Sequence, residues 1–121
     1  MQTFKPFDRF VCVGDSRSVD VGPFRVVATI HDDSSTRPTD FDCYDEGMIK
    51  AWNAGEWHYV GLVLSVWVDD IELCDQIGLW GIDANFPGSD NANLTTLANE
   101  LLPEAIDEGR AVLARLRSVA A

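Results

Sequence analysis

Residues 57–68, WHYVGLVLSVWV, carry the strongest strand signal in the chain. Side chains alternate between the two faces of a strand, so each apolar position can be assigned to a face. One face carries His58, Val60, Leu62, Leu64, Val66 and Val68, and we expect it to lie in the core. The other face carries Trp57, Tyr59, Gly61, Val63, Ser65 and Trp67. A strand that is apolar on both sides indicates the centre of a sheet that is covered on most of both faces.

Turn-forming residues divide the rest of the chain into further elements around this strand. Four strands are expected, at residues 7–13, 23–31, 57–68 and 73–83. The segment GDSRSVDVG (14–22) would be the loop of a hairpin between the first two, and DDIE (69–72) would connect the last two.

Two helices are expected, at residues 43–53 and about 92–119. Asp40 or Asp42 would cap the first helix, and Gly55 suits the position after its end. Pro103 lies inside the second and predicts a kinked or broken helix. The order ββαββα predicts an α+β fold, in which helices pack on an antiparallel sheet of about four strands. A length of 121 residues suits a single domain, 1–121.

The composition predicts a packed domain that needs no metal, disulfide or cofactor. Hydrophobic residues make up 46% of the chain. Cys12, Cys43 and Cys74 lack the CxxC spacing of a zinc site, so we expect reduced thiols. The N-terminus lacks the apolar segment of a signal peptide, and the longest apolar run (60–68) is too short to span a bilayer. We therefore expect a soluble protein in the cytoplasm of a bacterial host cell.

Charge is the sharpest functional signal. The net charge of −11 argues against nucleic-acid binding and favours a partner with a basic surface. No Lys or Arg lies between Lys50 and Arg110. Six acidic residues in this interval are candidate partner-binding residues: Asp69, Asp70, Glu72, Asp75, Asp83 and Asp90. Either they only keep the surface soluble, or they imitate a phosphate backbone and occupy a basic nucleic-acid groove.

Aromatic residues form a second candidate surface. Trp57, Tyr59 and Trp67 share one strand face, and Trp80 lies on the returning strand, where it can be their cross-strand neighbour. Such a set is either covered by a helix or left open as a patch for a partner or a homodimer.

Catalytic and metal-binding motifs are weak in this sequence. His31 stands in IHDDSS, and His58 lies on the apolar strand face, so a hydrolase that uses either histidine with nearby carboxylates is only a third hypothesis. Asp83, Asn85 and Gly88 match three positions of a calcium loop, but Pro87 and Leu94 occupy positions where oxygen ligands belong. A Pro-Gly turn is the better interpretation.

The stretches AWNAGEWHYVGLVLSVWVDD (51–70) and GLWGIDANFPGSDNANLTTLANELLPEA (78–105) resemble a family of small proteins encoded by phages, prophages and plasmids. The shared elements are Trp52, EWHYVG (56–61) and LWGID (79–83), followed by an amphipathic helix. The family has no established catalytic residues, so none is carried over. The resemblance implies a mobile genetic element, whose small acidic proteins are similar in size and charge to anti-CRISPR and anti-restriction inhibitors.

The leading hypothesis is therefore a non-enzymatic phage or mobile-element protein that inhibits a host CRISPR–Cas complex or restriction nuclease by occupying its basic surface. The alternative is a structural or regulatory homodimer that associates through the aromatic sheet face.

Overall fold

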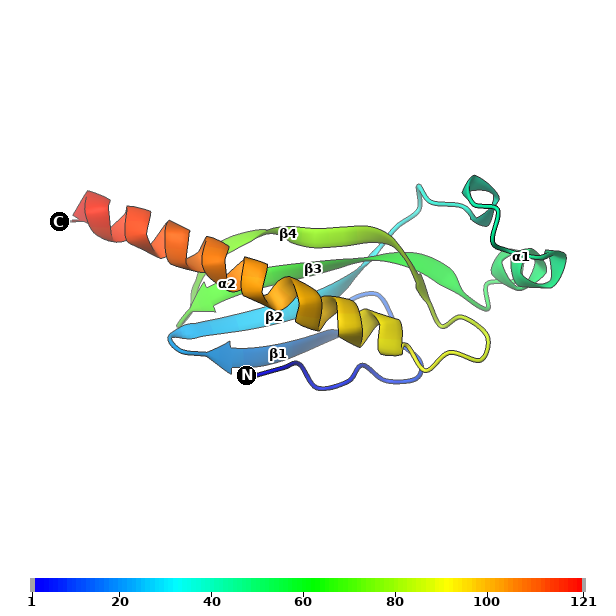
Figure 1. The fold of residues 1–121 in the computed structure, drawn as a ribbon, viewed down its shortest axis with the longest axis horizontal. Coiled ribbons are helices and arrows are strands. Elements are labelled where there is room, and N and C mark those ends of the chain that lie inside the picture. Colours follow the sequence, from blue (N-terminus) through cyan, green and yellow to red (C-terminus); the bar gives the residue numbers. More distant parts are fainter. Residues whose placement is uncertain (1, 121) are drawn as a thin grey trace.

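A computed structural model describes residues 2–120 and has an α+β fold (Figure 1). The strands are β1 (Ser16–Val21), β2 (Phe24–Asp32), β3 (His58–Val68) and β4 (Ile71–Ala84). The helices are the 3₁₀ helix η1 (Pro38–Asp40), α1 (Glu46–Asn53) and α2 (Ala92–Ala120). The strands form one antiparallel sheet in the order β1-β2-β3-β4. The predicted class is confirmed, although the order of elements includes η1, which the predicted order lacks.

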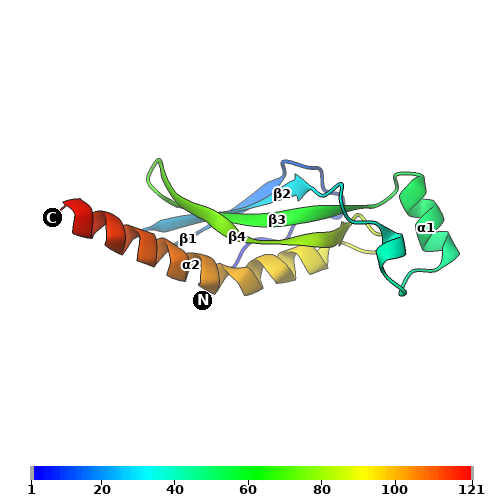
Figure 2. The ribbon, with the colours of Figure 1, turned by 90° about the horizontal axis from the view of Figure 1, so that it is seen from above.

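The main core lies between α2 and one face of the sheet (Figures 1 and 2). Val60, Leu62, Leu64 and Val66 on β3 are fully buried against it, as their spacing predicts. Each such side chain contributes about 1.5–3 kcal/mol through removal from water. Over most of its length the opposite sheet face has no helix among residues 2–120, as Figure 2 shows, and only its end at Tyr59 packs against α1. The prediction that both faces are largely covered is therefore wrong for most of the sheet.

The first predicted strand, 7–13, is wrong. Residues 2–15 form an irregular arm, and the first strand is β1, inside the segment predicted as a loop. Phe7 and Val11 of the arm are buried in the main core, so their apolar character reflects packing beside α2. The backbone N–H of Phe7 donates to Thr95 Oγ1 of α2 at 3.0 Å. The start of the arm therefore pairs with side chains of α2, and only its last two residues, Gly14 and Asp15, hydrogen bond to Ile30 of β2.

The hairpin turns are tighter than predicted. Val21 pairs with Phe24, so only Gly22 and Pro23 connect β1 to β2. Gly22 has a φ of 57°, which glycine adopts without strain. Asp69 and Asp70 alone connect β3 to β4, because β4 begins at residue 71 and not 73.

The two helices also differ from prediction. The N-cap of α1 is Asp45, whose carboxylate accepts a hydrogen bond from Met48 N at 2.8 Å, so neither Asp40 nor Asp42 caps it. Helix α2 runs through Pro103 as one helix, so of the two predicted alternatives, a kinked or a broken helix, the broken one is wrong. Pro103 is exposed, whereas Leu102 and Ala105 on either side of it are buried. Packing on the sheet offsets a proline cost of about 3 kcal/mol.

Strand β4 is an edge strand with three register shifts relative to β3. One of them places Trp80 and Gly81 opposite Gly61, and Gly81 has a φ of 74°. Bulges of this kind twist an edge and interrupt its hydrogen-bonding pattern, which discourages pairing with a strand of another molecule.

Candidate functional site

Four of the six predicted acidic residues lie together at one end of the β3–β4 hairpin. We call Asp69, Asp70, Glu72 and Asp75 the acidic tip. All four are exposed. Asp69 has a φ of 50°, a conformation that aspartate tolerates better than most residues. Like charges on one hairpin repel, and exposure to water keeps that cost small.

The acidic tip has no basic partner among residues 2–120. The ion pairs in this part of the chain are Arg17–Asp8 at 3.2 Å, Arg25–Asp20 at 2.9 Å and Arg110–Asp107 at 3.6 Å. Gln76 donates a hydrogen bond to the Asp75 carboxylate at 2.9 Å, but its amide carries no charge. The tip therefore presents unneutralised negative charge to the solvent.

One row of side chains crosses all four strands beside the tip. Asp20 pairs with Arg25, Arg25 with Trp67, and Trp67 with Glu72. Cross-strand partners point to the same side, so these four lie on the uncovered sheet face. The hydrogen bond from Arg25 lowers the pKa of Asp20 below its ordinary value. A surface hollow between the two turns is lined by Asp20, residues 22–24, Arg25, Asp69 and Asp70.

The other two predicted acids lie at the opposite end of the sheet. Asp83 pairs with Tyr59 and is half-buried, and Asp90 lies in the loop before α2, where its carboxylate accepts from Ala92 N at 3.0 Å. At about 3.3 Å per residue, the strand between Glu72 and Asp83 spans roughly 30 Å or more. The six acids therefore do not form one cluster.

Two of the four predicted aromatic residues are unavailable to a partner. Trp57 and Tyr59 are buried in a second small core beneath α1, which we call the aromatic cluster. The indole N–H of Trp57 donates to Met48 O of α1 at 2.8 Å. Burial raises the pKa of Tyr59, and its hydroxyl has no hydrogen-bond partner among residues 2–120. Tyr44, Trp52 and Phe86 pack around this pair.

The other two aromatic residues lie on the uncovered face. Trp67 is half-buried, and its indole N–H donates to Ser65 Oγ at 2.9 Å. Trp80 is 58% exposed. Its ring lies against Gly61, where a Cβ would fall 2.2 Å from Cε3 of the indole, so no larger residue fits at position 61. Trp80 is also close to His31, with 6.2 Å between ring centroids.

Neither histidine forms a catalytic arrangement in the described part of the chain. His31 is exposed, His58 is half-buried, and neither hydrogen bonds to a carboxylate, hydroxyl or thiol among residues 2–120. The same residues contain no group of three or more His, Cys, Asp or Glu side chains that could hold a metal ion. The side chain of Asn85, from the calcium-like loop, bonds instead to Val11 N at 2.9 Å.

Asp33 is a buried hydrogen-bond centre that the sequence did not reveal. Its carboxylate accepts from Ser35 N and Oγ, from Thr36 Oγ1 at 2.8 Å and from Gly81 N at 2.7 Å. Burial alone would raise the pKa of Asp33, but these hydrogen bonds outweigh it and lower the pKa. Asp33 thereby joins the loop after β2 to the bulge in β4.

Asn91 is a second such centre. It is fully buried, and its side chain bonds to Asn85 N at 2.8 Å and to the carbonyl oxygens of Asp8 and Arg9 at 3.1 and 3.0 Å. The loop before α2 thus holds the N-terminal arm in place. Sequence patterns cannot show this role, because the bonded groups are more than 80 positions apart.

Comparison of the chain with protein-family models, curated proteins and solved structures finds no match to any of them. Within residues 2–120, no helix combines the length and apolar character needed to cross a membrane.

Proposed function

We propose that this protein is a non-catalytic acidic binding protein whose acidic tip occupies a basic surface on a partner protein. The single supporting observation is that Asp69, Asp70, Glu72 and Asp75 are exposed on one hairpin and take part in none of the ion pairs among residues 2–120. An exposed set of unpaired carboxylates can replace phosphate oxygens in front of Lys and Arg. Trp67 in the adjacent row supplies aromatic contact area at the same place.

The class of partner follows from this chemistry. A surface that binds unpaired carboxylates at close spacing is rich in Lys and Arg, and surfaces of that kind commonly bind nucleic acid. A host CRISPR–Cas complex or restriction nuclease is the specific partner that we propose, in line with the resemblance to mobile-element proteins. Inhibition would follow because the tip and the nucleic acid compete for the same groove.

The test is capture of partners from bacterial lysate on the immobilised full chain, with identification by mass spectrometry. The variant Asp69→Lys/Asp70→Lys/Glu72→Lys should lose the partners that the unmodified protein captures. Captured partners should also be released by about 500 mM salt and by an added DNA duplex, since screening and competition both act on charge contacts.

The matched control is Asp42→Lys/Glu56→Lys/Glu100→Lys. These three exposed acids lie outside the tip, and their replacement changes the net charge by the same amount. Capture that survives in this control and disappears in the tip variant locates binding at the tip. Equal loss in both variants would mean that overall charge, and not the tip, attracts the partner.

A second candidate function is association through the uncovered sheet face, favoured by the exposure of Trp80. Such a structural or regulatory homodimer should persist at about 500 mM salt, because apolar contacts are not screened. Trp80→Ala should dissociate it. A sedimentation experiment that finds no salt-resistant dimer contradicts this alternative.

A further inference from the structure

The C-terminal part of α2 extends beyond the sheet that covers the rest of the helix. Gly109 still packs on the sheet, where a Cβ would lie 2.7 Å from Val66 Cγ1. From residue 114 to residue 120 every side chain is exposed. We call residues 110–120 the projecting end, which at 1.5 Å per residue is about 16 Å long. Figures 1 and 2 show it running past both hairpin turns.

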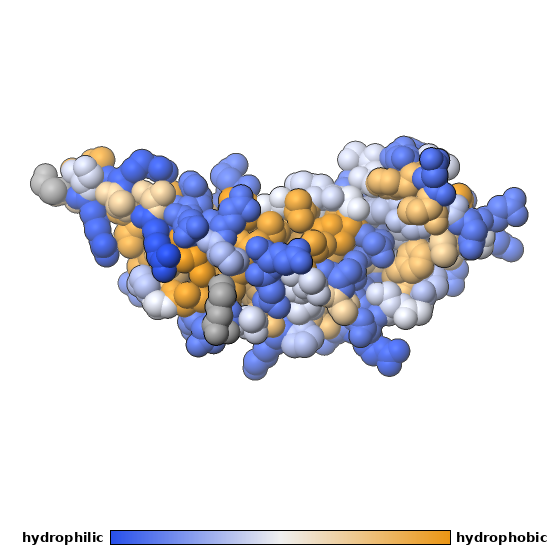
Figure 3. Space-filling model, in the orientation of Figure 1, coloured by the Kyte–Doolittle hydropathy of each residue, from blue (hydrophilic) through white to orange (hydrophobic). Residues whose placement is uncertain are grey.

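The projecting end continues the apolar stripe of the buried helix. Upstream, the stripe consists of buried residues at helical spacing: Leu94, Ala98, Leu102, Ala105, Ile106 and Gly109. Downstream, Val112, Leu113, Leu116 and Val119 keep the same spacing. Leu113 still packs against the main core, so the unpartnered part of the stripe is Leu116 and Val119. Leu116 is 50% exposed and Val119 is 86% exposed. Figure 3 shows apolar surface at this end of the molecule. Exposed apolar residues that repeat along one helix face indicate a surface for a partner.

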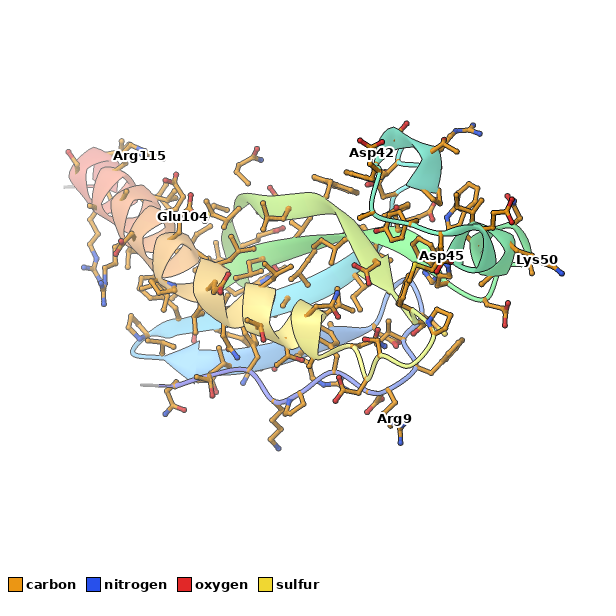
Figure 4. The ribbon with its side chains drawn as sticks, turned by 45° about the vertical axis from the view of Figure 1, so that its right-hand side comes forward. Arg9, Asp42, Asp45, Lys50, Glu104 and Arg115 are labelled. Atoms are coloured by element: carbon orange, nitrogen blue, oxygen red, sulfur yellow. The ribbon has the colours of Figure 1, made fainter. Side chains whose placement is uncertain are left out.

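Charge identifies the partner that fits this stripe. The projecting end holds three of the nine basic residues of the chain, Arg110, Arg115 and Arg117, and none of its twenty acidic residues. Arg115 and Arg117 form none of the ion pairs among residues 2–120, and Arg115 extends from the helix in Figure 4. Cys74 lies on β4 within the acidic tip and pairs with Val66, on which Gly109 packs, so the tip lies near the base of the projecting end. Burial and the nearby acids raise the pKa of the Cys74 thiol, and Arg115 of the same chain opposes this shift.

We propose that the projecting end binds a second copy of this chain in an antiparallel, two-fold dimer. Antiparallel overlap places the C-terminal turn of each projecting end beside the base of the other, where the acidic tip lies. Leu116 and Val119 then pack across the two-fold axis, while Arg115 and Arg117 approach Asp69 and Asp70 of the second copy. Two molecules of net charge −11 repel in most orientations, and this one brings opposite charges together.

The test is sedimentation equilibrium of the full chain at about 10–200 µM and at about 50 mM salt. The expected mass is twice the monomer mass of 13.4 kDa. Leu116→Asp should weaken dimerisation at least tenfold. Ala114→Asp adds the same charge to the opposite side of the same helical segment and should change it less than twofold. Both positions are exposed, so circular dichroism should show unchanged folding.

Charge reversal provides an independent measurement. Arg115→Glu/Arg117→Glu should weaken self-association, and mixing this variant with Asp69→Lys/Asp70→Lys should restore a heterodimer. A monomer at every concentration, or equal effects of Leu116→Asp and Ala114→Asp, would overturn the proposal. A dimer that Trp80→Ala breaks and Leu116→Asp leaves intact would also overturn it, in favour of the sheet face.

The dimer and the proposed function share the acidic tip but can fail separately. Leu116→Asp leaves the tip unchanged, so this variant should remain able to capture a basic partner while it sediments as a monomer. If no basic partner exists, the purified unmodified protein should still sediment with the mass of a dimer. Capture of a basic partner therefore tests the proposed function, and the sedimentation mass tests the proposed dimer, each independently of the other.

Discussion

The two ends of the β3–β4 hairpin belong to the same pair of strands but have opposite character. At one end, the aromatic cluster is buried beneath α1, and the side chains of Asp33 and Asn91 are buried and hydrogen bonded. At the other end, the acidic tip is exposed and has no ion-pair partner among residues 2–120. Buried packing and exposed charge therefore lie at different ends of the hairpin, so stability and surface charge can be changed separately.

The largest expected effect is at the buried end. Trp57→Ala removes a fully buried indole and its bond to Met48 O, and should lower the free energy of unfolding by about 3–5 kcal/mol. Trp80→Ala is the matched control, because its indole is mostly exposed and should cost far less. Urea denaturation measures the free energy of unfolding of both variants. Equal losses of stability would show that the covered and the uncovered aromatic residue contribute alike.

The next effect concerns the N-terminal arm. Asn91 has a φ of 65°, so Asn91→Gly keeps the backbone relaxed and removes only the side-chain hydrogen bonds. Loss of these buried bonds should cost about 2–4 kcal/mol. Trypsin should then cleave after Arg9, labelled in Figure 4, faster than in the unmodified protein. Unchanged cleavage would show that the core contacts of Phe7 and Val11 hold the arm without Asn91.

A smaller, pH-dependent effect is expected at Asp33. Its pKa is lower in the folded protein, so the stability that it contributes is present above the unfolded value of about 3.9 and is lost as the pH falls through the folded value. Asp33→Asn should cost about 1.5–3 kcal/mol above about pH 5. The difference from the unmodified protein should shrink below about pH 4. A difference that is constant with pH would contradict the role of the ionised carboxylate.

The smallest effect on stability is expected at the tip. Asp70→Lys/Glu72→Lys should change the free energy of unfolding by no more than about 0.5 kcal/mol per site, because both side chains are exposed and unpaired. Asp69 is left unchanged in this variant, because its φ of 50° disfavours lysine. Thermal denaturation checks this at low salt, where repulsion is strongest. A large loss would mean that the tip has a structural role, and the separation of the two ends would not hold.

Local patterns predicted β3 and α2, in which apolar residues recur at the spacing of a strand or of a helix. The alternation in β3 identified the face that α2 covers, and the spacing of Leu94, Leu97 and Leu101 identified that helix. The position of β1 could not be predicted in this way. Phe7 and Val11 of the N-terminal arm are as apolar as Val19 of β1, so their residue types do not show which segment is the strand. Only the packing of the arm beside α2 separates it from a strand.

The candidate site was predicted only in part, for the same reason. Asp69, Asp70, Glu72 and Asp75 lie together because they are neighbours along one hairpin, which a sequence reveals. Asp83 and Asp90 are separated from them because β4 is long, and the length of a strand depends on its pairing partner.

Four properties follow from side-chain order alone: the α+β class, the core face of β3, the apolar stripe of α2 and the excess of negative charge on the second hairpin. These properties depend on side-chain order over short distances, where the periods of strand and helix apply. Two further properties depend on the folded arrangement: α1 covers Trp57 and Tyr59 but leaves Trp80 exposed, and α2 extends past the sheet. Whether a side chain is covered depends on where segments distant in sequence pack. The local spacing of apolar residues carries no information about that packing.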